Sequence, residues 1–122
     1  MAGSSGSLHE NEQSLNPEII DRHRAIVSIM EELEAIDWYD QRVSAATDAE
    51  LKELLAHNRD EEKEHCSMVL EWLRRRDPKL NEHLRTYLFT DGSLLKIEEE
   101  AEGKGGGGSS GDGSLGIGSL RS

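Results

Sequence analysis

The stretch "NPEIIDRHRAIVSIMEELEAIDWYDQRVSAA", residues 16–46, decides the fold. Asn16 is a favourable N-cap, Pro17 suits the first helical turn, and Glu18 lies beside the positive end of the helix dipole. No further glycine or proline interrupts the stretch. The pattern therefore predicts one continuous helix over residues 17–45.

The residues that follow predict a second long helix. "TDAE", residues 47–50, offers a capping box from Thr47 to Glu50, so a helix is expected over about 48–76. Two long helices joined by a turn of two or three residues form an antiparallel hairpin. A lone hairpin buries too little apolar surface to offset its conformational entropy. Its apolar rows are therefore expected to meet another copy of the chain, a third helix, or both.

Shorter helices are expected after the hairpin. The Asp-Pro pair at 77–78 ends the second helix and begins a third over about 78–90. An Asp-Gly turn then precedes "SLLKIEEEAE", residues 93–102, which predicts a last short helix. No strand pattern is found along the chain. The predicted class is all-α: an antiparallel two-helix hairpin followed by a short C-terminal helix.

Both ends of the chain differ in composition from this helical part. Residues 1–15 are small and polar without periodicity, and we expect a disordered tail there. Nine of the 12 glycines lie from Gly103 onward, which predicts a Gly/Ser linker over 103–113. The helical domain is then 16–102, and the terminal peptide 114–122 forms a separate segment.

The bulk composition excludes several classes of function. A formal charge of −11 argues against a nucleic-acid partner, because phosphate binding needs clustered Lys and Arg. The single cysteine excludes an intramolecular disulfide and indicates a reducing compartment. No signal-peptide pattern is present, and the apolar runs, such as "AIVSIM", are too short to span a bilayer. We expect a cytoplasmic protein without a membrane partner.

Three potential metal ligands lie inside rows that the heptad spacing assigns to the helix interface. Glu32 lies in the row of the first helix, and Glu62 and His65 lie in the row of the second. The first row is Ala25, Ile29, Glu32, Ile36, Tyr39 and Val43, and the second is Leu51, Leu55, Asn58, Glu62, His65, Val69 and Trp72. Each row thus places acidic or imidazole side chains where apolar ones are expected.

Two explanations remain open for these polar residues. In the first, His65 is a hydrogen-bonded interface histidine and Glu62 pairs with Arg or Lys, although Arg59 and Lys63 lie on other rows. In the second, a divalent metal supplies the positive charge that buried carboxylates need. Residues three apart on a helix lie about 5–6 Å apart, close enough to share an ion.

The ligand types favour particular metals and a particular assembly. Carboxylate and imidazole together suit iron or manganese, and the absence of thiolates argues against structural zinc. Di-iron carboxylate bundles use a Glu from each of two helices and Glu-x-x-His from each of the other two. One hairpin contains half of that set, so two copies related by a two-fold axis would complete it.

Several blocks of the chain, taken in order, resemble the encapsulated ferritins, a two-helix branch of the ferritin-like superfamily. These blocks are "RHRAIVSIMEELEAIDWYDQRV" (22–43), "AHNRDEEKEH" (56–65), "LEWLRRRDPK" (70–79) and "HLRTYLFTDG" (83–92). The resemblance implies that two hairpins form a ferritin-like four-helix bundle with a di-iron ferroxidase centre of Glu32, Glu62 and His65 across the dimer interface. It further implies iron oxidation by dioxygen and dimers assembled into an open ring, a decamer.

The terminal peptide carries a second resemblance. "GSLGIGSLR", residues 113–121, is similar to the peptide that directs cargo into encapsulin nanocompartments, with Leu115, Ile117 and Leu120 as apolar anchors. The alternative for this tail is simple disorder. The resemblance implies an encapsulin shell protein as partner and a place inside that shell, where the iron mineral would collect. A redox-inactive alternative is a metal-stabilised assembly or cargo adaptor.

Further residues receive roles mainly from the family. The family carries carboxylates matching Glu31 and Glu34 as an accessory site that attracts ions, and calcium or other divalent ions could occupy it or the main site. The alternative is a solvated acidic face. Trp38 is expected beside them. Tyr39 either hydrogen-bonds a metal ligand, takes part in redox chemistry, or packs its ring in the core.

The remaining candidates receive no functional role. Cys66 is treated as a packing residue, because it follows His65 and its side chain points about 100° away from that of His65 around the helix. His23, His57 and His83 have no carboxylate at the spacing of a shared ligand and are assigned no role.

Overall fold

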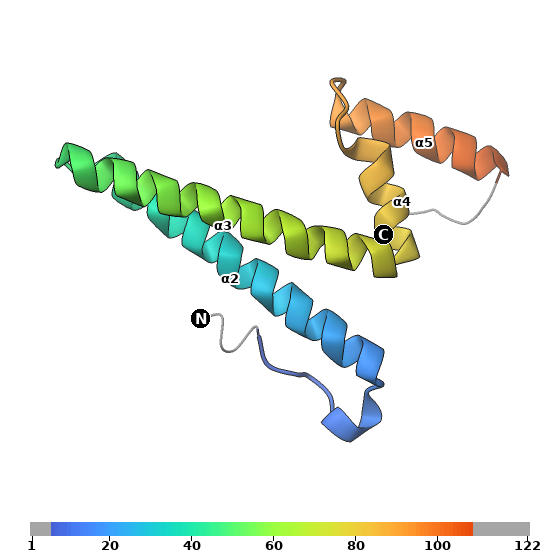
Figure 1. The fold of residues 1–122 in the computed structure, drawn as a ribbon. Coiled ribbons are helices and arrows are strands. Elements are labelled where there is room, and N and C mark those ends of the chain that lie inside the picture. The colour runs from blue at the N-terminus through green and yellow to red at the C-terminus, as the bar shows by residue number, and fades with distance from the viewer. Residues whose placement is uncertain (1–5, 109–122) are drawn as a thin grey trace. The chain divides into compact units, whose positions relative to one another are not determined.

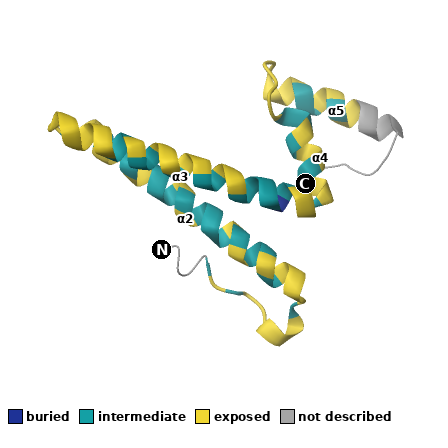
Figure 2. Cartoon of the chain, in the orientation of Figure 1, coloured by how far each residue is buried: buried dark blue, intermediate teal, exposed yellow. Residues whose placement is uncertain are grey.

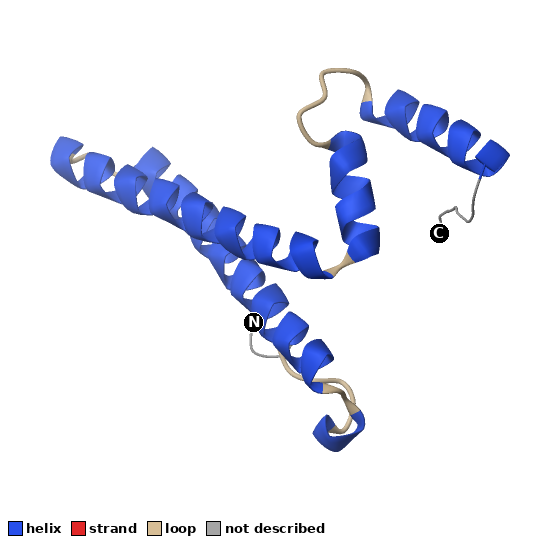
Figure 3. Ribbon diagram, turned by 45° about the vertical axis from the view of Figure 1, so that its right-hand side comes forward, coloured by secondary structure: helices blue, strands red, loops and turns tan. Residues whose placement is uncertain are grey.

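The computed structural model describes residues 6–108, and within that range every regular element is helical (Figures 1 and 3). The elements are a 3-10 helix η1 (Glu12–Ser14) and the α-helices α2 (Pro17–Ala45), α3 (Ala49–Arg76), α4 (Pro78–Tyr87) and α5 (Leu94–Gly108). The chain divides into two compact units, Met1–Asp77 and Pro78–Ser122. The all-α prediction is confirmed.

The first long helix begins as the sequence predicts. The Asn16 side chain accepts a hydrogen bond from the Ile19 N–H at 2.9 Å, Pro17 occupies the first turn, and α2 continues without a break to Ala45. A side-chain acceptor at this position satisfies one of the backbone N–H groups that the first turn leaves without a partner.

The second long helix begins one residue later than the predicted capping box. Its N-cap is Asp48, not Thr47, and the Asp48 carboxylate accepts the Leu51 N–H at 2.9 Å. The chain stays extended from the C-cap of α2, Ala46, to Asp48. A carboxylate at this position also interacts favourably with the helix dipole, which a threonine hydroxyl does not.

Helices α2 and α3 lie side by side and run antiparallel, as the hairpin prediction requires (Figure 1). Polar contacts join them toward both ends. Near the turn end, Arg59 Nη1 donates to Asp40 Oδ1 at 3.1 Å. At the open end, Arg22 Nη2 donates to the backbone carbonyl of Arg76 at 3.2 Å and so satisfies a carbonyl in the last turn of α3.

The hairpin has almost no buried core of its own. Among the residues whose burial is described, only Leu73 is buried, with 6% of its surface exposed (Figure 2). Other large apolar side chains of α2 and α3 stay open, including Ile26 at 48%, Leu33 at 54%, Leu54 at 55% and Met68 at 60%. This exposure is what the sequence predicts for a hairpin that completes its core against another surface.

In the second unit, α4 begins at Pro78 as predicted but ends at Tyr87 instead of residue 90. Leu88 N–H closes the final turn on the Leu84 carbonyl at 2.8 Å, and Phe89 then takes a left-handed backbone with φ of 63°. A left-handed residue ends a helix because it cannot continue the right-handed turn.

Helix α5 exceeds its predicted end. The Ser93 hydroxyl accepts the Lys96 N–H at 3.3 Å near its start, and the helix runs to Gly108, six residues past the predicted end at 102. The first part of the expected linker is therefore helical. Once a helix is nucleated, each added residue brings one backbone hydrogen bond, and this can carry it into a glycine run despite low propensity.

The N-terminal segment contains one short ordered turn where none was expected. The Asn11 side chain accepts the Gln13 N–H at 3.1 Å and caps η1. Residues 1–5 and 109–122 lie outside the described residues, and so do Leu115, Ile117 and Leu120 of the terminal peptide. Within the described part, no helix is both long and apolar enough to cross a membrane.

Candidate metal centre

The hairpin brings together the three side chains that the heptad rows assign to the helix interface. Glu32 projects from α2, and Glu62 and His65 project from adjacent turns of α3. One ligand atom from each lies within 4.8 Å of the others, and all three side chains are half-buried. Two carboxylates and an imidazole therefore share one small space between the helices.

Among the described residues, no Arg or Lys pairs with the two carboxylates of this cluster. A hydrogen bond shared with Glu62 raises the pKa of the Glu32 carboxyl, and burial and repulsion by the Glu62 charge raise it further, while His65 acts in the opposite direction. The nearby cations pair elsewhere, since Arg59 and Lys63 both contact Asp60. This removes the basic partners that the metal-free explanation of the cluster requires.

His65 lies between two carboxylates of its own helix. Its Nδ1 is 3.8 Å from Glu62 Oε1, and its Nε2 is 3.9 Å from Glu61 Oε1. The second oxygen of Glu61 is 3.9 Å from His57 Nε2, so the expectation that His57 has no paired carboxylate is wrong. Sequence reasoning missed Glu61, although its spacing of four residues from both histidines was visible.

The accessory residues lie outside the group of three donors. Glu31 is exposed, and its charge contributes to raising the pKa of Glu32, whereas Glu34 is half-buried. The Arg42 guanidinium lies 5.9 Å from the Trp38 ring centre and 5.5 Å from that of Tyr39. Both rings thus have a cation–π contact, and their predicted roles near a metal stay predictions.

Cys66 lies next to His65 on α3, and its interpretation as a packing residue stays a prediction. It is a half-buried free thiol. Burial raises the pKa of the thiol, and the charge of Glu32 adds to this, so the thiolate form that would bind metal is disfavoured.

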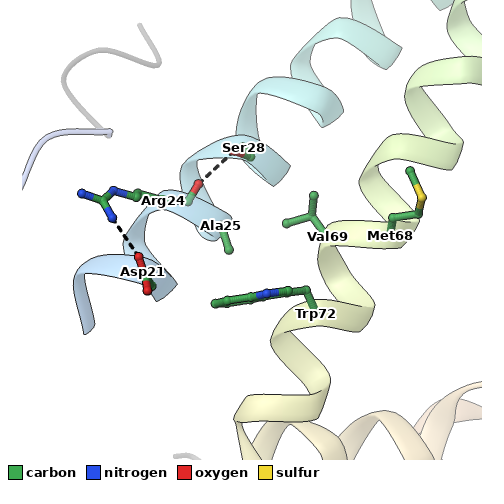
Figure 4. Close-up of a pocket in the computed structure, with 7 residues that line it drawn as sticks. All are labelled: Asp21, Arg24, Ala25, Ser28, Met68, Val69 and Trp72. Carbon is green, nitrogen blue, oxygen red and sulfur yellow. Dashed lines mark hydrogen bonds and ion pairs between the residues drawn. The ribbon is translucent and has the colours of Figure 1, made fainter. Parts of the chain in front are cut away.

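A separate groove of about 470 Å³ opens between α2 and α3 toward the end where the chain enters α2. Val69 and Trp72 of α3 point across it toward Ala25 of α2, and an Arg24–Asp21 ion pair of 2.8 Å lies at its rim (Figure 4). The full lining is Asp21, Arg24, Ala25, Ser28, Met68, Val69 and Trp72. It shares no residue with the three-donor cluster.

The donor set defines the class of protein. A Glu on one helix facing Glu-x-x-His on its antiparallel neighbour is half of the ligand set of a carboxylate-bridged bundle. Two oxygen donors and one nitrogen donor, without thiolate, suit iron or manganese. The fold and the cluster together are those of a ferritin-like helical protein.

Comparison with known proteins narrows this class to one family. The EncFtn-like family matches residues 7–91. The "Encapsulated ferritin-like protein" of Rhodospirillum rubrum is 62% identical over 129 residues, covering 99% of this chain and 92% of that protein. The "Encapsulin nanocompartment cargo protein EncC" of Myxococcus xanthus is 31% identical over 104 residues, covering 78% and 80%. The chain belongs to the EncFtn-like family, the encapsulated ferritins.

A solved structure agrees with this assignment. The crystal structure of protein ne0167 from Nitrosomonas europaea aligns with a TM-score of 0.70 at 56% identity. The alignment covers 72% of this chain and 97% of that one. The resemblance predicted from the sequence blocks is confirmed.

Proposed function

We propose that this protein is a ferroxidase that oxidises Fe²⁺ to Fe³⁺ with dioxygen at a di-iron site shared by two copies of the chain. The observation that carries the proposal is the cluster of Glu32, Glu62 and His65, whose donor atoms lie within 4.8 Å of one another, while the nearby Arg59 and Lys63 pair with Asp60. A bound cation would relieve the repulsion that raises the pKa of Glu32.

A second copy completes the site. Three donors from one chain leave iron short of ligands, whereas two chains related by a two-fold axis supply four carboxylates and two imidazoles. The apolar side chains that α2 and α3 leave exposed supply a surface for such pairing. Assembly of these dimers into a decameric ring, as the family resemblance implies, is part of the proposal.

The protein side chains bind and orient the substrate iron. The chain's negative charge raises the local concentration of Fe²⁺, and Glu31 and Glu34 extend this attraction beside the cluster. On binding, Glu32 and Glu62 would offer carboxylate oxygens to the iron. Neutral His65 offers the lone pair of one ring nitrogen.

The redox step balances with dioxygen as the oxidant. Each of two Fe²⁺ ions loses one electron, and two electrons with two protons from solvent reduce one dioxygen to hydrogen peroxide. Two further Fe²⁺ ions would carry the reduction to water. Fe³⁺ then hydrolyses readily and leaves as oxo-hydroxide.

The test measures aerobic Fe²⁺ oxidation by absorbance together with oxygen consumption. Glu32→Ala, Glu62→Ala and His65→Ala should each oxidise iron slowly, while Glu53→Ala, which removes an exposed carboxylate of α3 outside the cluster, should match the parent. Variants of the cluster that oxidise iron as fast as the parent would refute the proposal. Metal binding without oxygen consumption would instead indicate a structural metal or a cargo adaptor.

We further propose that the protein works as cargo inside a cytoplasmic encapsulin shell, where the mineral collects. The support is the similarity to the Myxococcus xanthus relative, an encapsulin nanocompartment cargo protein by name, and the peptide 114–122 with Leu115, Ile117 and Leu120. Removal of 114–122 should leave iron oxidation by the free protein unchanged and abolish its co-purification with a co-expressed shell protein. Retention in the shell without this peptide would contradict the assignment.

A further inference from the structure

Glu61 lies between two histidines on the exposed side of α3. Its Oε1 is 3.9 Å from Nε2 of His65, and its Oε2 is 3.9 Å from Nε2 of His57. His57, Glu61 and His65 follow one another at intervals of four residues, so they lie one above another on successive helical turns. Each oxygen of this carboxylate therefore faces a ring nitrogen.

The two nitrogens of His65 face different carboxylates, and this determines which nitrogen can bind a metal and which carries the proton. Nδ1 faces Glu62, a member of the three-donor cluster, whereas Nε2 faces Glu61, which is not in the cluster. A neutral imidazole carries one N–H donor and one lone pair. If Nδ1 gives its lone pair to a metal beside Glu62, the proton must be on Nε2, pointing at Glu61.

We propose that Glu61 is a positioning residue for the metal centre: its carboxylate accepts the Nε2–H of His65 and so keeps the Nδ1 lone pair directed at the space shared by Glu32 and Glu62. The inference deepens the proposed function and rests on it in taking His65 as a ligand. Carboxylates that accept the outer N–H of a metal-binding histidine orient the ring and make its other nitrogen a stronger donor.

The distance and the surroundings agree with this role. At 3.9 Å the contact is electrostatic, and binding of a cation at Nδ1 makes the Nε2–H more acidic, which draws it toward the carboxylate. The neighbouring Asp60 is engaged with Arg59 and Lys63 and does not compete for His65. The Glu61 side chain is 49% exposed, so its effect comes through His65 and not through packing.

Anaerobic titration with Co²⁺, followed by its visible absorption, tests the proposal without iron or dioxygen. We expect Glu61→Ala to weaken Co²⁺ binding about 10- to 100-fold. Glu61→Gln should lose less, because an amide oxygen still accepts the N–H. Glu53→Ala removes a carboxylate from the same helix outside these contacts and should bind Co²⁺ as the parent does.

A double-mutant cycle and a direct view of the imidazole separate positioning from other roles. In a His65→Ala background, Glu61→Ala should have no further effect on Co²⁺ affinity. The ¹⁵N spectrum of His65 should show protonation at Nε2 in the parent and a mixture of tautomers in Glu61→Ala. An equal loss in both backgrounds, or an unchanged His65 spectrum, would overturn the proposal and identify Glu61 as an independent ligand or a bystander.

These measurements distinguish a failure of the positioning role of Glu61 from a failure of the ferroxidase proposal. If the cycle and the spectrum come out as expected while no variant or parent oxidises iron, Glu61 positions His65 and the ferroxidase proposal is wrong. If iron oxidation is lost in the cluster variants but Glu61→Ala binds Co²⁺ normally, the ferroxidase proposal holds and the positioning role does not.

Discussion

Replacement of Glu32 by glutamine should stabilise the metal-free protein while removing its response to metal. In the folded apoprotein the pKa of Glu32 is raised above its usual value of 4.5, first through the hydrogen bond with Glu62. A raised carboxyl pKa contributes stability that is complete below the unfolded pKa and is lost as the pH rises through the folded value. Above the folded pKa of Glu32, the apoprotein therefore carries the full repulsion between the two carboxylates.

The geometry sets the size of the effect. Two unit charges at most 4.8 Å apart repel by about 1 kcal/mol in a water-like medium, and by more where the site is partly shielded from water. Glu32→Gln should therefore raise the free energy of unfolding by about 1 kcal/mol at pH 8 and by clearly less at pH 4.

The assay is urea denaturation followed by circular dichroism, in chelator and at one protein concentration. Glu53→Gln makes the same change of charge at an exposed position of α3 and should alter the free energy of unfolding little. Co²⁺ at 100 times its dissociation constant should add about 2.7 kcal/mol to the parent, and almost nothing to Glu32→Gln. A metal-free Glu32→Gln that is less stable than the parent at pH 8, or no more stabilised than Glu53→Gln, would refute the electrostatic account.

Three further expectations concern the hairpin itself. Asp48→Ala removes the observed N-cap and should lower the free energy of unfolding by about 1 kcal/mol in urea, whereas Thr47→Ala should change it little. Leu73→Ala truncates the one buried side chain in the part of the chain whose burial is described, and should cost about 2 kcal/mol in the same assay. The pKa of Glu71 is lowered to about 2, first by its hydrogen bond with Arg74, so this stabilisation is present above pH 4.5 and is lost as the pH falls toward 2. Glu71→Gln should therefore show a shallower loss of helicity over that range in an acid titration; a titration that coincides with the parent would contradict the pairing.

Local signals in the sequence were sufficient for most of the fold. Asn16 and Pro17 mark the start of α2 because cap chemistry depends on only a few neighbouring residues. Glu32, Glu62 and His65 could be grouped because helical spacing places each on a row that faces the other helix. Both inferences need only the geometry of a single helix and the assumption of an antiparallel partner.

The start of α3, the end of α4 and the role of Glu61 were missed because neighbouring residues offer similar local signals. Thr47 and Asp48 are both good caps, and the choice between them depends on where the chain leaves α2. The end of α4 depends on Phe89, a bulky residue with no intrinsic preference for the left-handed backbone that it adopts. Glu61 lies four residues from both histidines, and in an acid-rich helix this spacing alone does not distinguish a functional contact from a solvated surface pair.

The hairpin's single buried side chain, Leu73, has a consequence for when the chain folds. A polypeptide with so little interior gains most of its stability only when its open apolar faces are covered. Dilution should then act like a denaturant: the midpoint of thermal melting should fall as the protein is diluted, and newly made chains should acquire their helical form on encounter with one another.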